Sequence, residues 1–145
     1  MPRVETSLDI PASPDQLWAV LGDFSNYPSW NPFITSIRGM LQEGDLLALK
    51  VKLPNQDPLD IEVRITELKE AECLRWRSYL GEENQIQGDH YLLLKGPPSG
   101  PTQLIHGEAF QGPGAEELVR AMEESTRAGF EAMNTALRKE TTARL

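Results

Sequence analysis

The sequence predicts an α+β domain: an antiparallel meander of about seven strands, two short helices after the first strand, and one long C-terminal helix. Two observations support this. Apolar and polar residues alternate with a period of two through the middle of the chain, as in strands with one buried face. Residues 115–141 instead repeat apolar side chains at steps of three and four, as in an amphipathic helix. Because no other segment is long enough, this helix is expected to cover the apolar face of the sheet.

The first strand is expected near residues 4–10, and helical signals follow it. Ser13 precedes Pro14 at the first helical position, and Gln16 nearly completes a capping box. Further along, every second residue from Leu59 to Ile65 is apolar. Turn residues separate the remaining apolar runs, which predict strands near residues 34–40, 46–53, 59–68, 73–80, 87–95 and 102–111. Gly112–Gly114 ends the last strand, and the long helix is expected to run from Ala115 to about Thr141.

Length and charge exclude several classes of protein. A chain of 145 residues is expected to form a single domain over residues 1–145. Its formal net charge of −8 repels phosphate backbones, so nucleic acid is not expected as a partner. The one cysteine, Cys73, forms no internal disulfide, the N-terminus lacks the apolar core of a signal peptide, and no apolar run is long enough to span a membrane. A cytoplasmic protein is therefore expected.

Six segments, in order along nearly the whole chain, resemble one known superfamily. They are Ile10–Pro14, Leu17–Phe24, Tyr27–Phe33, Gly88–His90, Thr102–Gly112 and Gly129–Arg138. The sequence resembles the START-like, helix-grip superfamily, specifically its bacterial polyketide cyclase/dehydrase and lipid-transport branch. The resemblance implies a strongly curved sheet that grips the C-terminal helix, with an apolar cavity between them. Members of the family bind lipids, polyketides, steroids or other hydrophobic small molecules, and a minority catalyse cyclisation or dehydration.

Strand parity brings three ionisable residues to one surface. His106 and Glu108 share a face of the last strand, and the loop centred on residues 96–101 places His90 roughly opposite them. In one interpretation the cluster contacts or deprotonates a ligand, since imidazole beside a carboxylate is an acid–base arrangement. In a second, it is a buried polar network that tethers two strands to the helix. In a third, two histidines and one carboxylate hold a metal ion.

Apolar residues near the expected cavity have two interpretations each. Trp30 and Phe33 either form a lid at the pocket rim or wedge the short helices against the sheet. Trp76 is either a flat wall for a ring-shaped ligand or a core residue. The apolar residues of the long helix are either an adaptable pocket wall or core packing. Together with the polar cluster, the expected ligand-binding residues are Trp30, Phe33, Trp76, His90, Leu92, His106, Glu108, Phe110, Met122, Phe130 and Met133.

The leading functional hypothesis is a binding protein for a hydrophobic or aromatic small molecule, such as a lipid or polyketide. The alternative is a cyclase or dehydratase in which His90, His106 and Glu108 act as acid and base. A third and weaker hypothesis is a protein-interaction module like the START-like activators of a heat-shock ATPase. No cofactor and no metal are expected, and nothing in the sequence indicates an oligomeric state.

Overall fold

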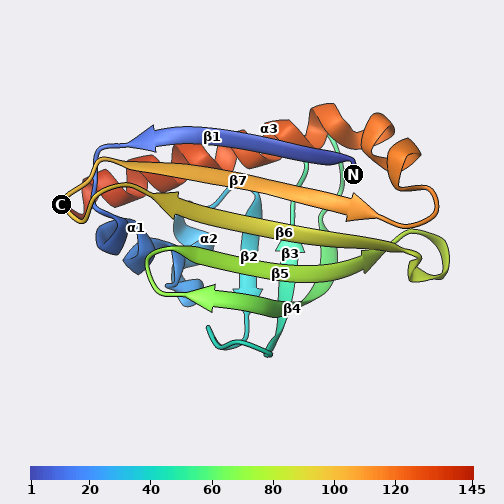
Figure 1. Cartoon of the computed structure of the whole chain (residues 1–145), viewed down its shortest axis with the longest axis horizontal. Helices are drawn as coiled ribbons and strands as arrows, with labels where there is room; N and C mark the ends of the chain where they lie inside the picture. The colour runs from blue at the N-terminus through green and yellow to red at the C-terminus, as the bar shows by residue number, and fades with distance from the viewer.

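One antiparallel sheet of seven strands curls around a long helix in the computed structural model, which describes residues 1–145 (Figure 1). The predicted α+β plan is confirmed, including the short helices after the first strand. The strands are β1 (Arg3–Ile10), β2 (Ile34–Arg38), β3 (Leu46–Val51), β4 (Leu59–Lys69), β5 (Cys73–Leu80), β6 (Ile86–Lys95) and β7 (Thr102–Gln111). The helices are α1 (Pro14–Leu21), α2 (Tyr27–Trp30) and α3 (Ala115–Ala143), with short 3-10 turns η1 (Phe24–Asn26) and η2 (Glu82–Asn84).

The strands follow the order β1-β7-β6-β5-β4-β3-β2, so the N-terminal strand pairs with the last one. Arg3 lies opposite Ala109 and Ile10 opposite Thr102. Strands β2 and β3 end two residues earlier than predicted. At the end of β2, Gly39 adopts a φ of 136°, a conformation open to glycine that turns the chain out of the sheet.

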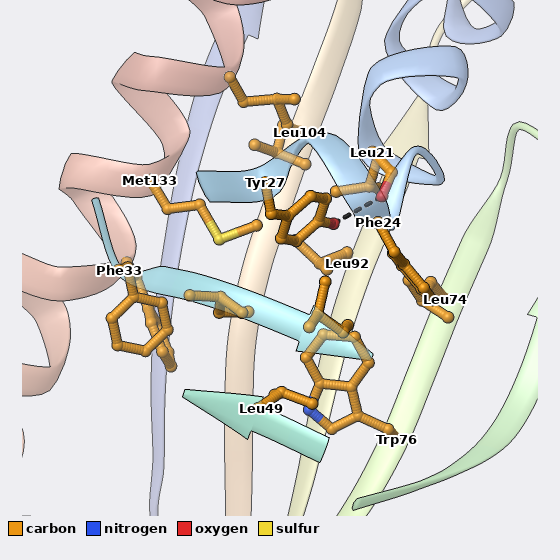
Figure 2. Close-up of a cluster of buried hydrophobic side chains, with 14 of the residues drawn as sticks. Leu21, Phe24, Tyr27, Phe33, Leu49, Leu74, Trp76, Leu92, Leu104 and Met133 are labelled. Carbon is orange, nitrogen blue, oxygen red and sulfur yellow. Dashed lines mark hydrogen bonds between the residues drawn. The ribbon is translucent and has the colours of Figure 1, made fainter. Parts of the chain in front are cut away.

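Helix α3 lies along β1 and β7 on the concave side of the sheet, with α1 and α2 near its C-terminal half (Figure 1). Its buried stripe includes Phe130, Met133 and Leu137 and joins the apolar face of the strands in a single main core. Figure 2 shows this core, in which the Tyr27 hydroxyl donates a hydrogen bond of 2.5 Å to the Leu21 carbonyl oxygen. No helix is long and apolar enough to cross a membrane.

Local signals at the element ends agree with the structure. The Ser13 hydroxyl accepts from the backbone N–H of Gln16, and the Gln16 side chain accepts from the backbone N–H of Ser13, which completes the capping box of α1. In the turn before β2, the Oδ1 of Asn31 accepts hydrogen bonds from the backbone N–H groups of Phe33 and Ile34, both at 2.9 Å. The segment Tyr27–Phe33 therefore orients the start of β2.

Candidate functional site

The β6–β7 pairing brings the three predicted polar residues into direct contact. His90 lies opposite Glu108, and His106 lies opposite Leu92. The Nδ1 of His90 is 3.1 Å from Oε1 of Glu108, and its Nε2 is 2.8 Å from Nε2 of His106. The side chains of His90 and Glu108 are 6% and 14% exposed, and His106 is fully buried. The cluster is therefore a continuous and almost dry hydrogen-bonded chain.

Two residues that the sequence analysis did not single out extend this chain. Asn134 of α3 places its Oδ1 2.8 Å from Nδ1 of His106, and its Nδ2 donates to the Thr6 hydroxyl at 2.8 Å. The Thr6 hydroxyl in turn donates to the His106 carbonyl oxygen at 2.9 Å. A signal was present in the sequence, because Asn134 is a polar residue within the apolar stripe of the long helix. We call Thr6, Asn134, His106, His90 and Glu108 the polar relay.

The order of donors and acceptors in the polar relay assigns its protons. Because the Thr6 hydroxyl donates to a carbonyl oxygen, it accepts from the Asn134 amide, which leaves Oδ1 of Asn134 as the acceptor facing His106. Nδ1 of His106 must then carry a proton. A neutral His106 has no proton on Nε2, so Nε2 of His90 is the donor in the contact between the two rings.

Burial keeps His106 neutral. Desolvation lowers the pKa of His106 well below its ordinary value of 6.5, the neighbouring His90 lowers it further, and the hydrogen bond to Asn134 acts in the opposite direction. The ring is clamped by Phe130, which stacks on it with centroids 4.3 Å apart and an interplanar angle of 19°. His90 is clamped in the same way by Trp76, at 4.9 Å and 17°. Both imidazoles therefore have little freedom to rotate.

The low pKa of His106 predicts loss of stability in mild acid. Below pH 6.5 the unfolded chain takes up a proton on His106 that the folded chain does not, so the free energy of unfolding falls as the pH falls. Once the unfolded group is fully protonated, the loss approaches about 1.4 kcal/mol per pH unit. Urea unfolding between pH 7.5 and pH 5 should therefore show a smaller acid dependence in His106→Gln than in the wild type. Equal dependence in the two proteins would contradict a buried neutral His106.

A pocket of about 280 Å³ lies between the sheet and the first half of α3. Most of its lining side chains are hydrophobic, and four of them are aromatic: Phe33, Trp76, Phe110 and Phe130. Leu59 on β4 is 46% exposed, and Glu123 on α3 is also exposed, so these residues mark the opening. His90, Glu108 and Ser78 are the polar residues on the sheet side of the wall.

Seven of the predicted ligand-binding residues line this pocket, namely Phe33, Trp76, His90, Glu108, Phe110, Met122 and Phe130. The other four do not. Leu92, His106 and Met133 are fully buried in the core behind the pocket wall, and Figure 2 shows Leu92 and Met133 packed among core side chains. Trp30 packs edge-on against Tyr27, with ring centroids 5.1 Å apart, which agrees with its interpretation as a wedge.

Several residues of the pocket walls on β3, β4 and the first half of α3 were not predicted from the sequence. Leu49, Val51, Ile61 and Val63 line the sheet side, and Leu118, Val119 and Thr126 line the helix side. Their alternation showed which face of each strand is buried, but core and pocket residues share that face. Only the curvature of the sheet separates the two groups.

A glycine makes room for the Glu108 carboxylate. A Cβ placed on Gly88 would overlap with Oε2 of Glu108 and would lie 3.2 Å from Oγ of Ser78. Oε2 and the Ser78 hydroxyl therefore border the same small space, while Oε1 contacts His90. This polar corner of the pocket, formed by Oε2 of Glu108 and the Ser78 hydroxyl, contains one acceptor and one hydroxyl group.

The polar relay does not have the geometry of the metal site considered above. His90 turns one ring nitrogen to Glu108 and the other to His106, so the three side chains do not converge on one point. No group of three or more His, Cys, Asp or Glu side chains in the chain is arranged to hold a metal ion.

Comparisons with known proteins agree with this architecture. Residues 1–139 match the family model described as polyketide cyclase/dehydrase and lipid transport. The structure of the Zhui aromatase/cyclase from Streptomyces sp. R1128 superposes with a TM-score of 0.77 at 19% identity, covering 99% of this chain and 94% of that chain. Norcoclaurine synthase from Thalictrum flavum, a point mutant in complex with a transition state analogue, superposes with a TM-score of 0.74 at 15% identity, covering 99% and 95%. Among curated protein sequences, none matches this chain.

Proposed function

Because the chain belongs to the polyketide cyclase/dehydrase and lipid transport family and has its helix-grip fold, we propose that it binds a small, mainly apolar molecule between the sheet and α3. The observation that carries this proposal is the pocket itself. Its volume of about 280 Å³ is close to the lower limit of about 300 Å³ for small-molecule sites, and its wall is apolar apart from a few polar groups. The four aromatic side chains in the wall favour a flat or ring-containing ligand.

Filling the pocket should weaken ligand binding without unfolding the protein. Val119 lines the pocket from α3 and is half-buried, so Val119→Trp should occupy ligand space. We expect the affinity for the neutral fluorescent probe N-phenyl-1-naphthylamine to fall at least 10-fold in a fluorescence titration. Ala121→Trp is the matched control, because Ala121 is exposed on the same helix and is absent from the lining. Equal probe binding by the two variants and the wild type would overturn the proposal, and native mass spectrometry of the purified protein offers an independent test for a co-purifying molecule.

Acid–base catalysis on the bound molecule is the second candidate function. It is favoured by one observation: the paired His90 and Glu108 side chains, 3.1 Å apart, form part of the pocket wall. A carboxylate in such a position can remove a proton next to a carbonyl group, the step that precedes both aldol-type cyclisation and dehydration. In this candidate function Glu108 is the base that faces the ligand, and His90 is the residue that holds it in place.

A further inference from the structure

We infer that Asn134, which lies outside the pocket, sets the electrical charge of the pocket's polar corner and thereby makes the pocket select neutral ligands over charged ones. The inference rests on the proposed binding of a small molecule and specifies the class of that molecule. It assigns Asn134 and Thr6 the role of positioning residues, because they act through His106 and His90 and touch no ligand.

The hydrogen bonds of the polar relay are donated in one direction, from His90 toward Thr6. Thr6 orients the Asn134 amide so that its oxygen faces Nδ1 of His106, which fixes the proton of that neutral ring on Nδ1. His106 can then only accept on Nε2, so His90 must donate from its own Nε2. The Nε2 proton of His90 is therefore used in the hydrogen bond to His106 and cannot be donated to Glu108.

The contact between His90 and Glu108 then needs one more proton. Without it, the lone pair of Nδ1 would face a carboxylate oxygen at 3.1 Å, an arrangement of two acceptors. With one proton the pair is either imidazolium with carboxylate or imidazole with carboxylic acid, and its net charge is zero in both forms. The polar corner of the pocket therefore carries no net charge.

No other lining group changes this balance. The lining includes no Lys or Arg, and its second carboxylate, Glu123, is exposed and forms an ion pair of 3.2 Å with Arg127. A ligand carboxylate or ammonium at the polar corner would lose its hydration without meeting an opposite net charge. A neutral hydroxyl can donate to Oε2 of Glu108 and accept from the Ser78 hydroxyl, which border the same space.

Asn134→Asp should reverse the relay. A carboxylate beside Nδ1 of His106 favours the doubly protonated ring, whose Nε2–H then donates to His90. His90 keeps a single proton, now on Nδ1, and donates it in a hydrogen bond to the ionised Glu108 carboxylate. The pair facing the pocket gains a net charge of −1, so the variant should favour a cationic ligand. A purely structural role for Asn134 would not change the preference of the pocket for ligand charge.

The binding test uses three probes that share a ring system, measured by calorimetry at pH 7: 2-naphthol, 2-naphthoate and 2-naphthylmethylammonium. For the wild type we expect 2-naphthol to bind at least 10-fold more tightly than either charged probe. In Asn134→Asp the affinity ratio of the cation to 2-naphthol should rise at least 10-fold. Thr135→Asp adds the same charge at an exposed neighbouring position of α3 and should change this ratio less than 2-fold.

The second measurement needs neither a ligand nor a variant. The chain has only two histidines, so nitrogen-15 spectra of their side chains report both tautomers directly. We expect His106 to be neutral at pH 7 with its proton on Nδ1; a proton on Nε2 instead would overturn the inference. Equal binding of naphthoate and naphthol, or an unchanged ratio in a folded Asn134→Asp variant, would overturn the inference while leaving the proposed function intact. Failure of the wild type to bind any of the three probes, or N-phenyl-1-naphthylamine, would overturn the proposed function and this inference with it.

Discussion

Truncation of Phe130 to alanine is expected to lower the free energy of unfolding by about 3–5 kcal/mol. The ring is 1% exposed and connects the core to the site: it stacks on His106 at 4.3 Å and meets His90 edge-on at 5.1 Å. Removing it loses the transfer free energy of the ring, leaves a cavity next to the pocket and removes the ring that stacks on His106. Urea unfolding at pH 7.5, where His106 is neutral in both states, measures the change.

Phe130→Leu separates packing volume from ring stacking. Leucine restores most of the buried volume, so the free energy of unfolding of Phe130→Leu should be roughly 1–3 kcal/mol higher than that of Phe130→Ala. Phe130→Ala could instead lower the free energy of unfolding by less than the removal of a single methylene group from a protein core does. That result would mean that α3 does not pack this ring against the sheet as the structure describes.

The second large effect concerns proton transfer and tests the catalytic candidate. We expect the wild type to accelerate hydrogen–deuterium exchange next to the carbonyl group of bound 2-tetralone, because Glu108 can accept the carbon-bound proton and return a deuteron from solvent. Glu108→Gln removes that base and should slow the exchange by about 10²–10⁴-fold, the usual contribution of a positioned general base. The exchange is followed by NMR in deuterated buffer.

Glu108→Gln is suited to this test because it should fold. The glutamine amide can donate to Nδ1 of His90 in place of the shared proton, so the relay keeps its hydrogen bonds. Glu131→Gln removes the same charge from the exposed face of α3 and serves as the control. If the wild type exchanges 2-tetralone no faster than Glu108→Gln, the site binds ligands without general-base catalysis.

Local sequence signals predicted most of the fold. The capping box around Ser13 and Gln16 positioned α1, and the Gly-Pro-Gly sequence at residues 112–114 placed the start of α3, since both depend on neighbouring residues alone. Trp76 and Ser78, two residues apart on β5, are both buried, as the alternation of a strand requires. The meeting of His90 with His106 and Glu108 could be predicted because a short hairpin connects their strands, and hairpin register follows from loop position.

The polar relay beyond that hairpin was decided by tertiary structure. Asn134 and Thr6 are separated by 128 residues in the sequence. Their contact depends on the pairing of β1 with β7 and on the packing of α3 against both strands. The division of the buried face into core and pocket was decided in the same way, because it depends on how far the sheet curves away from the helix.

By itself, the sequence determined the elements, their order, the buried face of the middle strands and the membership of His90, His106 and Glu108 in one cluster. These properties follow from periodicity, capping and hairpin register, which act over a few residues. Only the tertiary structure places His106 behind the pocket wall and Glu108 in that wall. It also brings Asn134 of α3 against His106, where the amide oxygen determines which nitrogens of His106 and His90 carry protons. The physical reason is that desolvation and hydrogen-bond direction depend on which side chains meet across distant elements.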